Sequence, residues 1–146
     1  MSEQIDIKKF SKVAAKFAEK IRLNNLPEKT IVFLYGELGA GKTEFVKSVL
    51  LALKIKQVVS PTFALHMHYE VDELNIEHWD LYRLENEDEL ESTGFWDQFS
   101  SEKYLIFVEW PQRLNLEWIP KDTNIIKIFI EIKSPKLRSI RIENIS

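Results

Sequence analysis

The clearest hydrophobic pattern in the chain is a pair of short, unbroken apolar runs at residues 30–35 and 104–108. Neither run contains a charged side chain, and both mix aromatic with β-branched residues. Runs of this length and composition are typical of strands that are buried on both faces of a parallel sheet. We therefore predict that these two segments form central parallel strands.

Two other segments repeat their apolar residues at helical spacing. The pattern predicts one amphipathic helix over residues 6–24 and a second helix after residue 43. Their inner faces would be formed by Phe10, Val13, Ala14, Phe17 and Ile21 in the first helix, and by Phe45, Val46, Val49, Leu50 and Leu53 in the second.

The first helical segment also carries lysines four residues apart, namely Lys8, Lys12, Lys16 and Lys20. We interpret them as a solvated face. The alternative is a basic stripe that meets an acidic partner or RNA.

The rest of the chain alternates as antiparallel strands do. Residues 63–69 and 75–80 predict one hairpin added to the sheet, and residues 122–132 and 137–142 predict a closing hairpin.

Between the predicted hairpins, a short acidic helix is expected. Asn86 and Glu89 have the capping-box spacing of a helix start, and Gly94 can end the helix. The acidic tract and its aromatic neighbours are open to two interpretations, an ordinary helix end or a docking surface for a basic partner. The aromatic residues are Trp79, Phe95, Trp96 and Phe99.

The most specific motif follows the first apolar run and opens the second helix. It is the phosphate-loop (P-loop) pattern Gly-x-x-x-x-Gly-Lys-Thr. Glycines let backbone N–H groups turn inward around a phosphate, and the start of a helix favours an anion. The lysine can reach the β- and γ-phosphates, and the threonine hydroxyl can bind Mg²⁺. We predict a nucleoside-triphosphate site formed by Gly36, Glu37, Leu38, Gly39, Ala40, Gly41, Lys42 and Thr43.

These elements together predict an α/β fold. We expect a P-loop NTPase-like mixed sheet with central parallel strands, antiparallel hairpins added to it, and helices on both faces. The length of 146 residues suits one domain, which we expect to span residues 1–146.

Three polar residues outside the loop are candidates for catalysis. Glu109 directly follows the second apolar run, where the metal-binding acid of a P-loop protein lies, so it should face Gly36 across one crevice. An exposed glutamate at a strand end is the alternative. Asp80 is a possible carboxylate near Mg²⁺, and Thr62 is either a loop residue that responds to the γ-phosphate or a turn residue that binds its own backbone.

A zinc site across the first hairpin is a further alternative, because His66, His68, His78 and Asp80 alternate along its strands. We favour the Mg²⁺ interpretation of Asp80.

Composition narrows the class of protein. The chain is 45% hydrophobic and 29% charged, as in ordinary globular proteins. It has no cysteine, which excludes disulfides and thiolate metal sites. The net charge of −3 argues against this chain gripping nucleic acid alone. With no signal peptide or membrane span in the sequence, we expect a cytoplasmic protein.

Five motifs in order resemble the TsaE family, the small ATPases of bacterial tRNA threonylcarbamoyladenosine biosynthesis. Beyond the P-loop, the matching segments are residues 60–63 (SPTF), 78–83 (HWDLYR), 87–90 (EDEL) with Gly94, and 108–111 (VEWP).

The resemblance implies ATP binding and slow Mg²⁺-dependent hydrolysis by a nucleotide-driven switch. It implies two partner proteins that carry out the transfer chemistry, with tRNA contacted only within the complex. Carried onto this sequence, Lys42 and Thr43 would serve the phosphates and Mg²⁺, and Glu109 the Mg²⁺. Thr62 and Asp80 would form a switch-like loop. Trp110 would be important beside the nucleotide. Two weaker correspondences suggest nucleotide contacts at Ser11 and Arg138.

Other functions share the P-loop. A small-molecule kinase would need an acceptor pocket and usually an arginine-bearing lid, and arginine is sparse between the P-loop and Glu109. A non-hydrolysing module that only binds nucleotide is the other alternative. A GTPase is disfavoured, because the sequence has no Asn-Lys-x-Asp motif.

Overall fold

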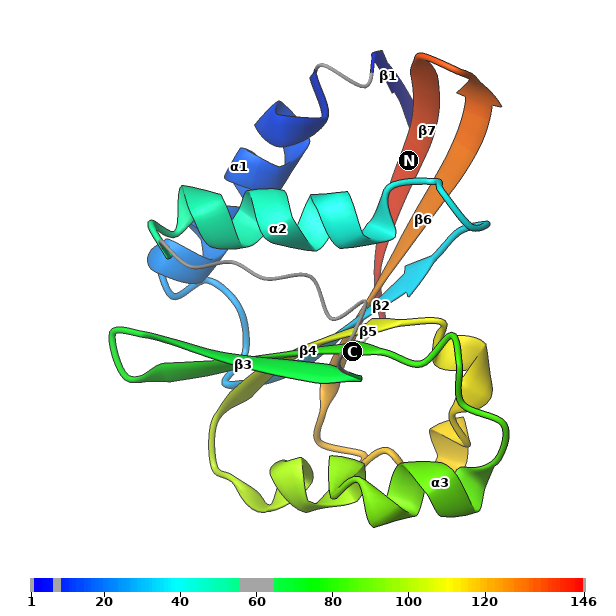
Figure 1. Ribbon diagram of the computed structural model, residues 1–146. Helices are drawn as coiled ribbons and strands as arrows, with labels where there is room; N and C mark the ends of the chain where they lie inside the picture. Colours follow the sequence, from blue (N-terminus) through cyan, green and yellow to red (C-terminus); the bar gives the residue numbers. More distant parts are fainter. Residues whose placement is uncertain (1, 7–8, 56–64, 146) are drawn as a thin grey trace.

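The protein is built around one mixed β-sheet (Figure 1). The computed structural model describes residues 2–6, 9–55 and 65–145. Within these residues the sheet has seven strands in the order β1-β7-β6-β2-β5-β4-β3.

The centre of the sheet is parallel, as the two apolar runs predicted. Strand β2 (Lys29–Tyr35) lies between β5 (Tyr104–Glu109) and β6 (Asn124–Ser134) and runs parallel to both. On the other side of β5, β4 (Leu74–Asp80) is also parallel to it. All six residues of β5 are buried.

Antiparallel strands complete both edges of the sheet. Strand β3 (His66–Val71) forms a hairpin with β4, and β7 (Leu137–Ile145) forms one with β6. Both predicted hairpins are therefore confirmed. Each hairpin has one strand that also pairs in parallel with a central strand. Strand β3 lies at one edge of the sheet, whereas β7 lies next to the strand at the other edge.

The start of the chain differs from the predicted helix over residues 6–24. The chain first forms β1 (Ser2–Asp6), which pairs antiparallel with β7, and only then helix α1 (Phe10–Arg22). The partner strand lies more than 130 residues away in the sequence, as in the pairing of Ile5 with Arg138. Local periodicity does not contain that information.

Helices cover both faces of the sheet, which confirms the predicted fold class (Figure 1). On one face, α1 and α2 (Lys42–Ala52) pack on each other and on the sheet, with Phe10 and Phe17 both edge-on to Phe45. On the other face lie α3 (Glu87–Ser92) and the 3₁₀ helices η2 (Phe95–Ser100), η3 (Pro111–Arg113) and η4 (Leu116–Trp118).

The N-cap predicted for α3 is present, but the returning bond from Glu89 goes to Glu85 and not to the N–H of Asn86 as in a capping box. Asn86 Oδ1 accepts a hydrogen bond from Glu89 N at 2.9 Å, and Gly94 follows the helix with a φ of 83°. The carboxylate of Glu89 reaches back to the N–H of Glu85 at 2.9 Å.

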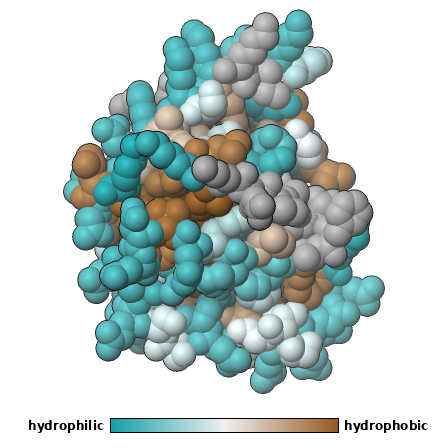
Figure 2. Space-filling view, turned by 60° about the vertical axis from the view of Figure 1, so that its left-hand side comes forward, coloured by the Kyte–Doolittle hydropathy of each residue, from teal (hydrophilic) through white to brown (hydrophobic). Residues whose placement is uncertain are grey.

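The face shown in Figure 2 is largely hydrophilic. Its largest hydrophobic area lies left of the centre, and smaller hydrophobic areas lie elsewhere on the same face. Among the described residues, no helix is long and apolar enough to cross a membrane.

Candidate functional site

The P-loop connects the end of β2 to the start of α2 and has the backbone that its glycines permit. Gly39 and Gly41 have φ values of 83° and 112°, a region that side chains with a Cβ rarely adopt. At Gly36 the constraint is space, because a Cβ there would lie 2.7 Å from the carbonyl oxygen of Ile130. The loop therefore depends on glycine at each of these three positions.

Lys42 lies inside this loop. It is 5% exposed, and its Nζ donates hydrogen bonds to the carbonyl oxygens of Gly36 and, at 3.2 Å, of Glu37. The Nζ atom also lies 4.1 Å from the ring centroid of Trp110, within range of a cation–π interaction. A buried ammonium that binds neutral carbonyls is ready to bind an anion that enters the loop.

The electrostatics of Lys42 agree with this position. Burial lowers the pKa of Lys42, and the negative charges of Glu109, Asp80 and Glu37 oppose the lowering. The lysine is thus coupled to both candidate carboxylates of the site.

Thr43 and Glu109 meet directly. The Thr43 hydroxyl lies 2.7 Å and 2.9 Å from the two carboxylate oxygens of Glu109, to which it donates. Glu109 ends the buried strand β5 and is only 2% exposed. It is therefore not an exposed glutamate at a strand end, which removes the alternative considered for this residue.

Glu109 has a second partner that the sequence did not reveal. His78 is completely buried, and its Nε2 lies 2.6 Å from Glu109 Oε2. His78 is part of the segment 78–83 that resembles the family, but the sequence suggested a role for it only in the zinc alternative. The sequence did contain one indication of this contact. His78 lies two residues before Asp80 and so on the same face of its strand, and that strand lies beside the one that ends in Glu109.

Asp80 lies beside these residues at the same edge of the sheet. It pairs with Glu109 in the register of β4 and β5, and its Oδ1 accepts a hydrogen bond from Tyr82 N at 3.1 Å. Burial raises the pKa of Asp80, and the nearby negative charge of Glu109 raises it further. A cation between the two carboxylates would reduce this repulsion.

Trp110 closes the site next to Glu109. Its backbone has a φ of 62°, and its ring lies 5.0 Å from the ring of Tyr82 and against Lys42. This residue is therefore held in an uncommon conformation that brings its side chain to the loop.

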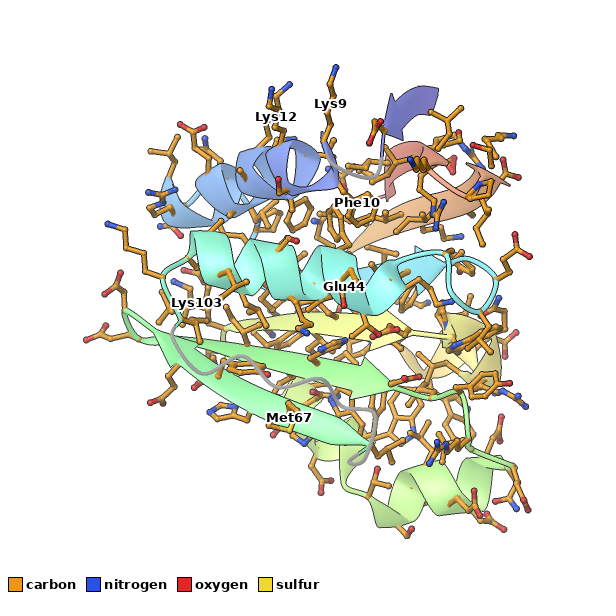
Figure 3. All side chains as sticks on the ribbon, turned by 45° about the horizontal axis from the view of Figure 1, so that its top comes forward. Lys9, Phe10, Lys12, Glu44, Met67 and Lys103 are labelled. Atoms are coloured by element: carbon orange, nitrogen blue, oxygen red, sulfur yellow. The ribbon has the colours of Figure 1, made fainter. Side chains whose placement is uncertain are left out.

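A cavity of about 300 Å³ adjoins the other side of the P-loop. Ser11 and Arg138, which were expected to contact nucleotide, both line it. Arg138 is nearly buried, and its Nε donates to the carbonyl oxygen of Ala40 at 3.0 Å. In Figure 3, Phe10 and Glu44, which also line the cavity, lie at the starts of α1 and α2.

Three candidates remain, Thr62, His66 and His68. Thr62 lies outside the described residues. His66 and His68 belong to a separate cluster on the β3–β4 hairpin, where both rings contact the carboxylate of Glu77. His78 lies apart from them, against Glu109, and the described part of the chain contains no group of three or more residues suited to hold a metal in the manner of the zinc alternative.

The side chains that converge at the start of α2 fit Mg²⁺ and a polyphosphate. Thr43, Glu109 and Asp80 offer oxygen atoms, the ligands that this hard cation prefers. Lys42 and the backbone of the glycine loop offer positive charge and N–H donors for phosphate.

Comparisons with known proteins agree with one another. The sequence model of the family described as "Threonylcarbamoyl adenosine biosynthesis protein TsaE" matches residues 6–140. Two curated relatives are named "tRNA threonylcarbamoyladenosine biosynthesis protein TsaE". The one from Aquifex aeolicus is 38% identical over 130 residues, which cover 87% of this chain and 86% of the relative. The one from Rickettsia typhi is 33% identical over 129 residues, which cover 86% of each protein.

A solved structure supports the fold. The crystal structure of Bacillus subtilus YdiB is similar to this chain with a TM-score of 0.69 and 23% sequence identity. The superposition covers 100% of this chain and 86% of the other.

Proposed function

This chain belongs to the TsaE family of tRNA threonylcarbamoyladenosine biosynthesis proteins, and from that premise we propose that it binds and slowly hydrolyses Mg²⁺-ATP. The observation that carries the proposal is the contact between Thr43 and Glu109 beside the buried Lys42. A hydroxyl at the start of a P-loop helix and a carboxylate at the end of a parallel strand are the two groups that hold Mg²⁺ in P-loop proteins.

Each residue has a defined task in this proposal. The N–H groups of residues 36–43 and the ammonium of Lys42 bind the triphosphate. Thr43 and Glu109 would hold Mg²⁺, which would neutralise negative charge on the phosphates. Asp80 or Glu109 orients the attacking water. Most of the rate enhancement comes from this electrostatic positioning.

The nucleotide base is expected on the side of the loop that faces Ser11 and Arg138. The cavity there is continuous with Gly39, Ala40 and Gly41, so a nucleotide whose phosphates lie in the loop can extend into it. We propose ATP as the nucleotide. Adenine selectivity is drawn from the family resemblance.

We propose that hydrolysis switches the interaction of this protein with two other proteins of the tRNA threonylcarbamoylation machinery. The transfer chemistry then belongs to those partners, and tRNA is contacted within the complex. The net charge of −3 supports this division, because a chain with this charge is poorly suited to hold tRNA alone.

The proposal is tested by ATP binding and turnover with Lys42→Ala. Loss of the ammonium removes the positive charge inside the loop, so we expect binding of a fluorescent ATP analogue to weaken by roughly a hundredfold or more. Lys16→Ala, on the exposed side of α1, removes the same charge at a distance and serves as the control. ATP turnover at the wild-type rate by Lys42→Ala would refute the assignment of the site.

The same assay separates hydrolysis from the alternatives. With γ-labelled ATP, Mg²⁺ and the two partner proteins with tRNA, the label should appear as inorganic phosphate. Transfer of the label to a metabolite would instead identify a kinase. Sustained partner activity over many turnovers with a non-hydrolysable analogue would identify a binding module.

A further inference from the structure

We propose that His78 is a positioning residue that fixes the carboxylate of Glu109 in the orientation needed to hold Mg²⁺. The inference rests on the proposed function, because it assigns a task to His78 in the same site. It concerns a residue that sequence reasoning left without a role there.

The geometry shows two donors that hold one buried carboxylate. Oε2 of Glu109 lies 2.6 Å from His78 Nε2 and 2.9 Å from the Thr43 hydroxyl, while Oε1 lies 2.7 Å from that hydroxyl. His78 and Glu109 are 0% and 2% exposed. Bulk solvent therefore does not reach this contact, and a buried carboxylate that loses a donor is strongly disfavoured.

The sheet brings the histidine to this place. His78 and Asp80 are two residues apart on β4, so their side chains are on the same face. Strand β5 runs parallel beside β4 and pairs Asp80 with Glu109. His78 pairs with Phe107, so it approaches Glu109 from two residue pairs further into the sheet, while Thr43 approaches it from α2.

The chemistry of the contact assigns a donor. A carboxylate only accepts hydrogen bonds, so the proton between the two groups belongs to His78 Nε2. The ring is held at its other end by complete burial, and its Nδ1 has no hydrogen-bond partner among the described residues. Among the described residues, the hydrogen bond of the His78 ring is therefore the one to Glu109.

This arrangement leaves one carboxylate oxygen, Oε1, free of the histidine, with Thr43 as its neighbour. With Oε2 held by His78, Glu109 is restrained from rotating, and Oε1 stays directed at Thr43 and at a metal bound to the threonine oxygen. Groups that orient metal ligands in this way typically contribute about 10- to 100-fold to metal affinity. We expect His78 to affect the affinity for Mg²⁺. It should not affect the affinity for the phosphates, which depends on Lys42 and the backbone of the loop.

The test is a Mg²⁺ titration of nucleotide binding, read by the fluorescence of a labelled ATP analogue. Two substitutions separate the position of the donor from the size of the side chain. The amide of His78→Gln places an N–H near the position of Nε2, whereas the shorter His78→Asn does not reach it. We expect His78→Asn to raise the half-saturating Mg²⁺ concentration about tenfold or more. His78→Gln should stay within about threefold of wild type, and both should bind the analogue equally well in EDTA.

One control variant and three contrary outcomes make this test decisive. His68→Asn, in the separate hairpin cluster, should leave the Mg²⁺ requirement unchanged. An equal Mg²⁺ requirement in wild type, His78→Gln and His78→Asn would overturn the positioning role while leaving the proposed function intact. Equal weakening in both His78 variants, with or without Mg²⁺, would also overturn it, because it would show a structural role only. A wild-type protein that binds the analogue without any response to Mg²⁺ would remove the proposed function, and this inference with it.

Discussion

Glu109 illustrates how much a single residue depends on its neighbours. Its backbone ends a strand that is buried throughout, and its carboxylate is kept in that environment by the Thr43 hydroxyl and by His78. Burial of a carboxylate is unfavourable unless hydrogen bonds or a cation compensate. Its position beside a P-loop lysine supports a metal-binding task in preference to a purely structural one.

Glu109→Gln is the residue-scale prediction. The amide keeps the shape of the side chain but removes its negative charge, so we expect hydrolysis of Mg²⁺-ATP to fall by about a hundredfold. Binding of an ATP analogue in EDTA should change by less than about threefold, since Lys42 and the loop are intact. Turnover measurements test the expected loss of hydrolysis, and fluorescence titration tests the expected retention of analogue binding. Glu117→Gln, in η4, is the exposed control, and equal loss of hydrolysis and binding would assign Glu109 to the fold alone.

At the scale of elements, the β3–β4 hairpin carries its own charge cluster. Glu77 is contacted by His66 and His68, and His66 stacks on Trp79 with ring centroids 4.1 Å apart. Burial acts to raise the pKa of Glu77, but the hydrogen bonds with the two histidines outweigh it, so that the pKa lies below its ordinary value of 4.5. The cluster thus stabilises the hairpin in a pH-dependent way.

Glu77→Gln tests this cluster. A carboxylate with a lowered pKa in the folded state adds stability above its unfolded pKa, and this stability is lost as the pH falls through the folded value. We therefore expect the variant to have a lower Tm than wild type at about pH 6, with the difference shrinking once the pH drops below about 4.5. Thermal denaturation followed by circular dichroism across this range measures it. A Tm difference that does not change with pH would contradict the ionic origin, and Glu70→Gln on the same hairpin is an exposed control.

Helix α3 contains a second local interaction that can be tested, its N-cap hydrogen bond. It has only six residues, and its first turn depends on the bond from Glu89 N to Asn86 Oδ1. Asn86→Ala should lower the free energy of unfolding by about 1 kcal/mol, whereas Asn86→Asp should retain most of it. Urea denaturation measures both. Equal stability of the two variants would show that the cap is not what holds this end of the helix.

At the scale of the whole molecule, the candidate site joins parts that are distant in sequence. It combines the start of α2, the end of β5 and the end of β4 at one edge of the sheet, with α1 and β7 along the adjoining cavity. A ligand that contacts all of these elements binds only the folded chain. Its binding energy is therefore added to the stability of the fold.

We accordingly expect Mg²⁺ and a non-hydrolysable ATP analogue to raise the Tm of the wild-type protein. At a hundredfold excess over Kd the stabilisation is about 3 kcal/mol, which corresponds to a rise of several degrees for a chain of this size. Differential scanning calorimetry checks the shift. Lys42→Ala should show a much smaller rise under the same conditions, corresponding to about 0.4 kcal/mol or less. A rise of equal size in that variant would place the nucleotide elsewhere.

Much of this protein is determined locally in the sequence. The apolar runs predicted the central strands because burial on both faces tolerates no charge. The glycine pattern predicted the P-loop because positive φ angles and close backbone approach exclude a Cβ, as at Gly36 and Gly41. Glu109 could be proposed because the end of a buried parallel strand is a defined place in the sheet.

Other features were decided by the tertiary structure alone. The first residues became β1 because β7 offered an open edge from the far end of the chain. His78 became a partner of Glu109, and Glu77 a partner of two histidines, because strand pairing and register set which side chains meet. Sequence spacing says which face of a strand a residue occupies, but not which strand lies beside it, since that depends on contacts between distant segments.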